Sequence, residues 1–219
     1  MGEINQRTSE RMNVCLTFQR LLMLMTVMLM ALVTFTTCVE DDEEKLNEDG
    51  LTSDVLKILQ GNALEKIKVL GVEIHGGNKP PDIEGSYNLS PLICVNSTVP
   101  GDSWVGLQMV DATVTFSAQN NSKLTVFTDF DESGGQGGKG TGSFITGSGN
   151  KFSVFVKMTG HLNGLPLETI DVYSGEISSS GIKDYHAVQI VTKGNIYTTL
   201  PEGEGRLVKV SGGLAERIK

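Results

Sequence analysis

The fold is decided by residues 151–177, KFSVFVKMTGHLNGLPLETIDVYSGEI. Apolar and polar side chains alternate through the first half of this stretch, with Phe152, Val154, Val156 and Met158 on one parity and Ser153, Lys157 and Thr159 on the other. Alternation with a period of two predicts a strand with one buried face. The Asn163-Gly164 pair that follows accepts the positive φ of a type I′ turn. The stretch therefore predicts a β-hairpin and, with it, an antiparallel sheet.

Similar segments on both sides of this hairpin predict more strands. They are residues 83–89, 105–118, 123–130, 141–146, 182–192 and 206–210. The glycine-rich residues 133–140 predict a long flexible loop. About eight strands joined by hairpins over residues 82–219 favour an all-β fold, an eight-stranded antiparallel up-and-down barrel, because closing the sheet removes both exposed edges. A β-sandwich is the alternative.

Residues 1–37 have the pattern of an export signal. Three arginines precede an apolar run at residues 21–35. A basic segment before a short apolar run is typical of a secretory signal peptide, and the run is shorter than the roughly 20 residues that a membrane span needs. A short single-pass anchor is the alternative. The basic segment is long, so Met12 competes with Met1 as the start of translation.

Cys38 follows this signal directly and precedes the acidic run Glu40-Asp41-Asp42-Glu43-Glu44. A cysteine in this place resembles the lipobox of bacterial lipoproteins, in which the thiol receives a diacylglycerol and becomes the new N-terminus. Phe35 and Thr37 depart from the residues that a lipobox prefers, and an ordinary signal peptide with an incidental cysteine is the alternative. The acidic composition of residues 38–50 predicts a solvated, self-repelling tether.

The charge of the chain argues against a nucleic-acid partner. The net charge is −8, and most of it comes from the tether, so the domain that follows is close to balance. No basic stripe is available to neutralise phosphates. Cys94 is the only cysteine after Cys38, which excludes an intramolecular disulfide in the mature domain, and its apolar neighbours predict a buried thiol.

Residues 51–81 predict a helical segment followed by a linker. Thr52 or Ser53 can cap the first helical turn, and Gly61-Asn62 is expected to break the helix into two pieces. The linker, residues 70–81, is rich in glycine and proline. A single amphipathic helix is not stable alone, so we expect this segment to pack on the barrel, with packing on a partner as the alternative.

Three segments carry a resemblance to a known family: GNKPPDIEGSY at 77–87, YSGEISSSGI at 173–182 and SGGLAER at 211–217. They resemble lipocalin-like lipoproteins of Bacteroides-type bacteria, over residues 51–219. Gly85-Ser86-Tyr87 is similar to the Gly-x-Trp/Tyr of the first lipocalin strand, where the aromatic ring plugs one barrel end. The resemblance implies a calycin-like barrel; it brings no established activity or ligand.

Three side chains are candidate ligand-binding residues, Tyr87, Trp104 and His186. The two aromatic residues are expected near a barrel mouth or plug, with core packing as the alternative. His186 shares its parity with Val188 and Ile190, so we expect it to point into the barrel. A buried, hydrogen-bonded histidine without a ligand is the alternative.

No metal, cofactor or catalytic activity is expected. Asp129, Asp131 and Glu132 offer carboxylates beside the glycine-rich segment, but they lack the spaced pattern of a calcium loop, and a solvated loop is the preferred interpretation. The three histidines lack the spacing of a zinc site. The sequence also lacks a nucleophile elbow, a phosphate loop, a dinucleotide fingerprint and paired carboxylates.

Together these patterns predict a lipid-anchored protein of the cell envelope, attached to the outer membrane through Cys38 and facing either the periplasm or the cell surface. Its barrel is expected to bury a small apolar or amphipathic ligand. A structural or assembly lipoprotein that uses the barrel as a scaffold for a protein partner is the alternative. An enzyme, the third hypothesis, would need a cleft with convergent ionisable residues.

Overall fold

The computed structural model describes residues 45–219 except 134, 195, 197 and 198. The predicted signal peptide, Cys38 and most of the acidic tether lie outside the described residues. None of the helices within the described part is long and apolar enough to cross a membrane.

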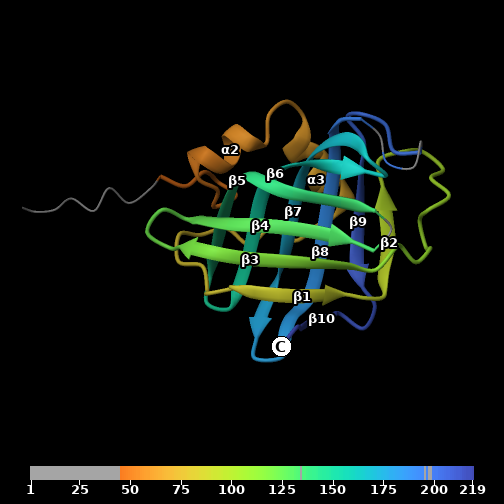
Figure 1. The fold of residues 1–219 in the computed structure, drawn as a ribbon. Coiled ribbons are helices and arrows are strands. Elements are labelled where there is room, and N and C mark those ends of the chain that lie inside the picture. Colours follow the sequence, from red (N-terminus) through yellow and green to blue (C-terminus); the bar gives the residue numbers. More distant parts are fainter. Residues whose placement is uncertain (1–44, 134, 195, 197–198) are drawn as a thin grey trace, which may run out of the picture. The chain divides into compact units, whose positions relative to one another are not determined.

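The described strands form one sheet (Figure 1), in the order β10-β1-β3-β4-β5-β6-β7-β8-β9-β2. The strands are β1 Gly85–Leu89, β2 Leu92–Ser97, β3 Ala112–Asn120, β4 Thr125–Glu132, β5 Gln136–Ser148, β6 Lys151–Leu162, β7 Leu165–Ser178, β8 Gly181–Lys193, β9 Gly205–Val210 and β10 Leu214–Arg217. β10 also pairs with β8, so β1, β3 to β8 and β10 close into a ring of antiparallel strands. The predicted all-β, eight-stranded fold is confirmed.

The hairpin that opened the sequence analysis is confirmed in register. β6 and β7 pair continuously from Lys151↔Glu176 to Leu162↔Leu165. Asn163 and Gly164 connect them with φ values of 50° and 79°, as a type I′ turn requires.

The strand that closes the ring was not predicted. Residues 206–210, the last strand expected from the sequence, form β9, but the closing strand is β10, which pairs with β1 and with residues 181–183 of β8. Residues 186–190 of β8 pair instead with β9, which pairs in turn with β2. β8 therefore belongs to the ring at its start and to a β8–β9–β2 extension farther along.

Two predicted boundaries in the middle of the chain are also wrong. β5 begins at Gln136, so most of the expected loop 133–140 is strand. Gly160 of β6 lies beside this part of β5, where a Cβ on residue 160 would come within 1.9 Å of the Gly137 carbonyl oxygen. The expected strand 105–118 begins only at Ala112; residues before it run beside β2, where Met109 N donates to Leu92 O at 2.7 Å.

The two predicted helical pieces are α2, Ser53–Ile58, and α3, Ala63–Leu70. The Thr52 hydroxyl accepts a hydrogen bond from Val55 N at 3.2 Å and caps α2, and the break falls at Gly61-Asn62 as expected. Buried side chains of the helices pack against the outer face of β6 to β9, in a cluster that includes Leu51, Val55, Ile67, Leu70, Phe155, Val172, Val188 and Leu207. These strands are consequently apolar on both faces.

Three buried hydroxyl groups on the outer face of the barrel form hydrogen bonds with the backbone of the linker after α3. Thr146 donates to His75 O at 2.7 Å, Ser174 donates to Glu73 O, and Ser153 accepts from His75 N at 2.8 Å. Thr146, Ser153 and Ser174 are cross-strand neighbours on β5, β6 and β7. The row therefore holds the linker across three strands.

Candidate ligand cavity in the barrel

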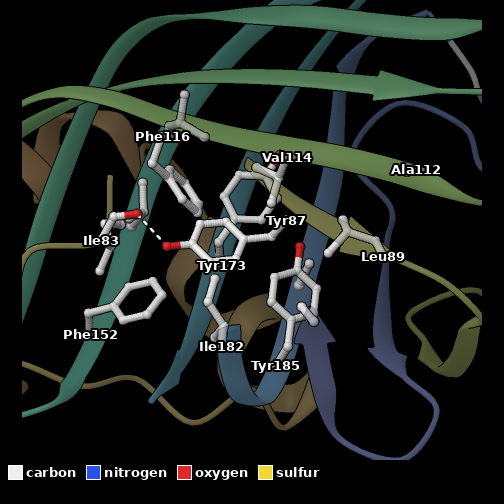
Figure 2. Close-up of a cluster of buried hydrophobic side chains, with 14 of the residues drawn as sticks. Ile83, Tyr87, Leu89, Ala112, Val114, Phe116, Phe152, Tyr173, Ile182 and Tyr185 are labelled. Carbon is white, nitrogen blue, oxygen red and sulfur yellow. Dashed lines mark hydrogen bonds between the residues drawn. The ribbon is translucent and has the colours of Figure 1, made fainter. Parts of the chain in front are cut away.

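Aromatic rings fill one part of the lumen (Figure 2). Phe116 lies at the centre, with its ring centroid 6.1 Å from Tyr87, 6.3 Å from Phe152 and 5.8 Å from Tyr173. All four side chains are buried. Edge-on and tilted ring pairs at these distances are favourable beyond the area they bury. This part of the barrel is a packed core, and it offers no room for a ligand of ordinary size.

A cavity of about 60 Å³ remains next to Tyr173. By the volume that one water needs, it has room for roughly four or five water-sized groups. Part of its wall is apolar, formed by Leu89, Leu92, Met109, Phe130 and Val208. Another part of the wall is polar, formed by Glu132, Gln136, Asp171, Tyr185, Gln189 and Arg206.

The polar part of the wall includes a row that crosses three strands. Asp171 of β7 pairs directly with Gln189 of β8, and Gln189 pairs with Arg206 of β9. Directly paired residues point to the same face of a sheet. The three side chains therefore stand together on the lumen wall.

The side chain of Asp171, at one end of this row, is buried. Its Oδ2 accepts hydrogen bonds from the Tyr173 hydroxyl at 2.9 Å and from Gln189 Nε2 at 3.4 Å. Its Oδ1 has no hydrogen-bond partner among the described residues. Burial raises the pKa of Asp171 to about 6, although hydrogen bonds from Thr169, Tyr173 and Gln189 oppose the shift.

Arg206 is held by a buried ion pair. Its Nε donates to Asp102 Oδ2 at 2.7 Å and its Nη2 donates to Asp102 Oδ1 at 3.1 Å. Burial alone would raise the pKa of Asp102, but hydrogen bonds from Arg206, Ser97 and the Trp104 backbone lower it to about 2. The third guanidinium nitrogen, Nη1, has no hydrogen-bond partner among the described residues.

Tyr185 is the third residue of the cavity wall, after Asp171 and Arg206, that has a polar atom without a hydrogen-bond partner among the described residues. Its hydroxyl group is buried and has no hydrogen-bond partner among the described residues. Burial raises the pKa of Tyr185 well above its ordinary value, so the hydroxyl stays protonated. Buried polar atoms without partners are rare and unfavourable. Tyr185, Asp171 and Arg206 all line a single cavity, and each has one such atom, so a small molecule bound there could supply the missing partners.

Tyr87 lies in the aromatic core and does not line the cavity. Its hydroxyl donates to Ile83 O at 2.8 Å, and the guanidinium carbon of Arg217 lies 4.9 Å from its ring centroid. Arg217 belongs to β10, directly opposite Tyr87 on β1. Tyr87 therefore packs where the ring of strands closes.

Trp104 lies one layer outside the cavity, in the loop between β2 and β3. The guanidinium carbon of Arg206 is 5.5 Å from its ring centroid. Trp104 thus covers the residue that lines the wall, and it is absent from the wall itself.

The expected inward orientation of His186 is wrong. Val188 and Ile190, which share its parity, pack against the helices on the outer face, while Tyr185 and Ala187 belong to the lumen core. Burial lowers the pKa of His186, whose Nδ1 lies 2.6 Å from Asp184 O. The apolar residues of β8 that share the parity of His186 face outward, because α2 and α3 cover that face of the strand.

The acidic residues near the glycine-rich segment are separated by strand alternation. Asp129 and Asp131 line a groove on the surface, whereas Glu132 is buried and lines the cavity. Within the described residues, no group of three or more His, Cys, Asp or Glu side chains is placed to hold a metal ion. Cys94 is a free, buried thiol whose pKa is raised by burial.

Comparison of the chain with protein-family models, curated proteins and solved structures finds no match in any of the three.

Proposed function

We propose that this chain is a lipid-anchored, extracytoplasmic binding protein whose lipocalin-like barrel holds a small amphipathic molecule. The ligand would occupy the cavity beside Asp171, Tyr185 and Arg206. Three residues that line one cavity each have a buried polar atom without a partner among the described residues, and this is the observation that carries the proposal. The mixed wall suits a molecule with one apolar and one polar end.

The size of the cavity limits the ligand. At about 60 Å³ it is far below the several hundred Å³ of a pocket for a drug-sized molecule. A long acyl chain or a ring system does not fit beside the aromatic core. The proposal is therefore restricted to compounds of roughly four or five non-hydrogen atoms.

Binding can be tested by saturation-transfer NMR on the full chain in detergent, with a panel of small alcohols, amines, amides and carboxylic acids. Ala187→Leu is the matched control, because Ala187 lines the cavity and a larger side chain there would occupy it without removing a polar group. We expect at least one compound to bind the wild type and to lose its signal in Ala187→Leu. Failure of every compound to bind would reject a ligand-binding role.

The anchor rests on Cys38 and is tested separately. In a bacterial host with lipoprotein processing, the wild type is expected to incorporate radiolabelled palmitate and to sediment with membranes. Cys38→Ala is expected to lose the label and to appear in the soluble fraction. A labelled Cys38→Ala protein would contradict acylation at this position.

A scaffold role is the second candidate, and one surface feature favours it. Val95, Val105 and Leu107 are exposed apolar side chains, and hydrogen bonds from Cys94 N to Leu107 O and from Gly106 N to Cys94 O bring their backbones together. Exposed apolar patches can mark protein contacts. Co-purification of one envelope protein that Leu107→Ser abolishes, with small-molecule binding unchanged, would support this role.

A further inference from the structure

We infer that the molecule held in this cavity carries a protonated primary amine, which pairs with Asp171. The inference rests on the proposed binding function and narrows it to one chemical class. It follows from the charges, the open hydrogen-bonding atoms and the rings that surround the cavity.

The charged groups around the cavity favour a cation. Asp171 from β7 brings a buried carboxyl group to the wall, and among the described residues Arg206 from β9 is the one basic residue that lines it. Arg206 is already neutralised by Asp102, which contacts it through both carboxylate oxygens. A small anion would therefore enter beside the Asp171 carboxyl group without a free countercharge among the described residues of the wall, whereas an ammonium group would supply a positive charge next to it.

The open atoms match the donors of an ammonium group. Asp171 is 2% exposed and Tyr185 is 1% exposed, and each has an oxygen without a partner among the described residues. An ammonium group has three N–H donors and no acceptor, so it can donate to both oxygens. Arg206 Nη1 is itself a donor, so a hydroxyl oxygen at the other end of the ligand would accept from it.

The remaining wall suits the carbon chain of such a molecule. Tyr173 and Tyr185 present aromatic rings, and Met109 and Phe130 present apolar surface. Aromatic faces attract ammonium groups when water is excluded. A short amino alcohol satisfies the carboxylate, the hydroxyl group and the guanidinium together.

Four probes of nearly equal size test the inference: ethanolammonium, propylammonium, 1-propanol and propionate. Affinities are measured by NMR titration of the full chain in detergent at pH 7.5. We expect both amines to bind, ethanolammonium the more tightly, and propionate not to bind. Asp171→Asn keeps the shape and removes the charge, and it is expected to weaken the amines about tenfold or more. Tyr185→Phe is expected to weaken them severalfold.

The pH dependence gives an independent readout. Protonation of Asp171, whose pKa is about 6 in the folded protein, removes the partner of the amine, so affinity is expected to fall as the pH drops below that value. Tyr173 and Tyr185 stay protonated throughout this range. In Asp171→Asn this part of the pH dependence is expected to disappear.

The outcomes separate the inference from the function on which it rests. If none of the four probes binds, the inference fails, and the proposed binding function is then decided by the wider panel of small compounds. If propionate or propanol binds, and its binding is abolished by Ala187→Leu but unchanged by Asp171→Asn, the proposed binding function stands. The inference that the ligand is an amine is then wrong. Amine binding that survives both variants lies elsewhere on this acidic protein and overturns the inference.

Discussion

Asp171 is the side chain that most distinguishes this lumen from a plain apolar core. It lies between Ile170 and Val172, which pack on the outer face, and it turns inward beside Tyr173. A buried carboxyl group is unfavourable unless hydrogen bonds or a counterion compensate it. Only one of its two oxygens has partners among the described residues, so a cost to folding remains.

That cost predicts a specific pH dependence of stability. The pKa of Asp171 is raised from 3.8 to about 6 in the folded protein. The folded state therefore has its full stability with respect to this group below about pH 4, where Asp171 is protonated, and loses part of it as the pH rises through 6. The full loss is about 3 kcal/mol. Asp171→Asn should therefore gain stability relative to the wild type between pH 4.5 and pH 7.5, as measured by urea unfolding at the two pH values. If the free energies of unfolding of Asp171→Asn and the wild type differ by the same amount at both pH values, ionisation of Asp171 does not destabilise the folded protein.

The buried Arg206–Asp102 ion pair predicts that a conservative substitution of one partner lowers the free energy of unfolding strongly. Both side chains are almost fully buried, and removing one partner of such a pair leaves the other charge uncompensated. Asp102→Asn is expected to reduce the free energy of unfolding by about 3 kcal/mol. Trp104 is the only tryptophan, so its fluorescence can follow unfolding.

The control is the exposed pair Lys139–Asp129, whose side chains are 72% and 41% exposed. Asp129→Asn is expected to cost less than about 1 kcal/mol, because solvent screens such pairs. If the two substitutions cost the same, burial of the Arg206–Asp102 pair does not control its energy.

At the scale of elements, the helices complete a core that the barrel cannot close alone. Ile67 of α3 is fully buried in the cluster on the outer face of β6 to β9. Ile67→Ala is expected to cost about 2–4 kcal/mol in urea unfolding, since it removes buried methyl groups and leaves a cavity. Val69→Ala, in the same helix at a residue that is 74% exposed, is expected to change stability by less than about 0.5 kcal/mol. A small effect of Ile67→Ala would mean that α3 is only loosely attached.

The sequence predicted elements where one local signal was sufficient. The β6–β7 hairpin follows from alternation plus Asn163-Gly164, and the break between the helices follows from Gly61-Asn62. The first half of β5 was missed because its glycines suggested flexibility, whereas Gly137 and Gly138 pair in register with His161 and Gly160 of β6. β10 has only four residues, too few for a pattern, and its role depends on pairing with distant strands.

The candidate cavity was not predictable for a related reason. A charged residue in an alternating strand ordinarily indicates the solvent face, so Asp171 and Arg206 gave no sign that they face the lumen. Where helices cover a strand, both faces are apolar and parity no longer distinguishes inside from outside. His186 was placed inward for this reason, and Tyr185 was overlooked.

For the whole molecule, the aromatic core determines how much of the barrel can act as a container. Phe116 contacts three other rings and does not line the cavity. Phe116→Ala is expected to cost about 3–5 kcal/mol and to open a dry, apolar space that binds benzene, as engineered cavities of this kind do. The wild type is expected not to bind benzene, which ligand-observed NMR can establish.

The same variant separates the two parts of the lumen. Binding of ethanolammonium beside Asp171 should persist in Phe116→Ala, because the wall of that cavity is unchanged, while Phe127→Ala, at an exposed ring of β4, should neither bind benzene nor lose much stability. Benzene binding by the wild type would mean that the rings leave an apolar compartment, and the ligand would then be larger and less polar than an amino alcohol. If only Phe116→Ala binds benzene, the aromatic core of the native barrel is closed to ligands, and the cavity at Asp171 is the part of the described lumen that is left to hold a small molecule.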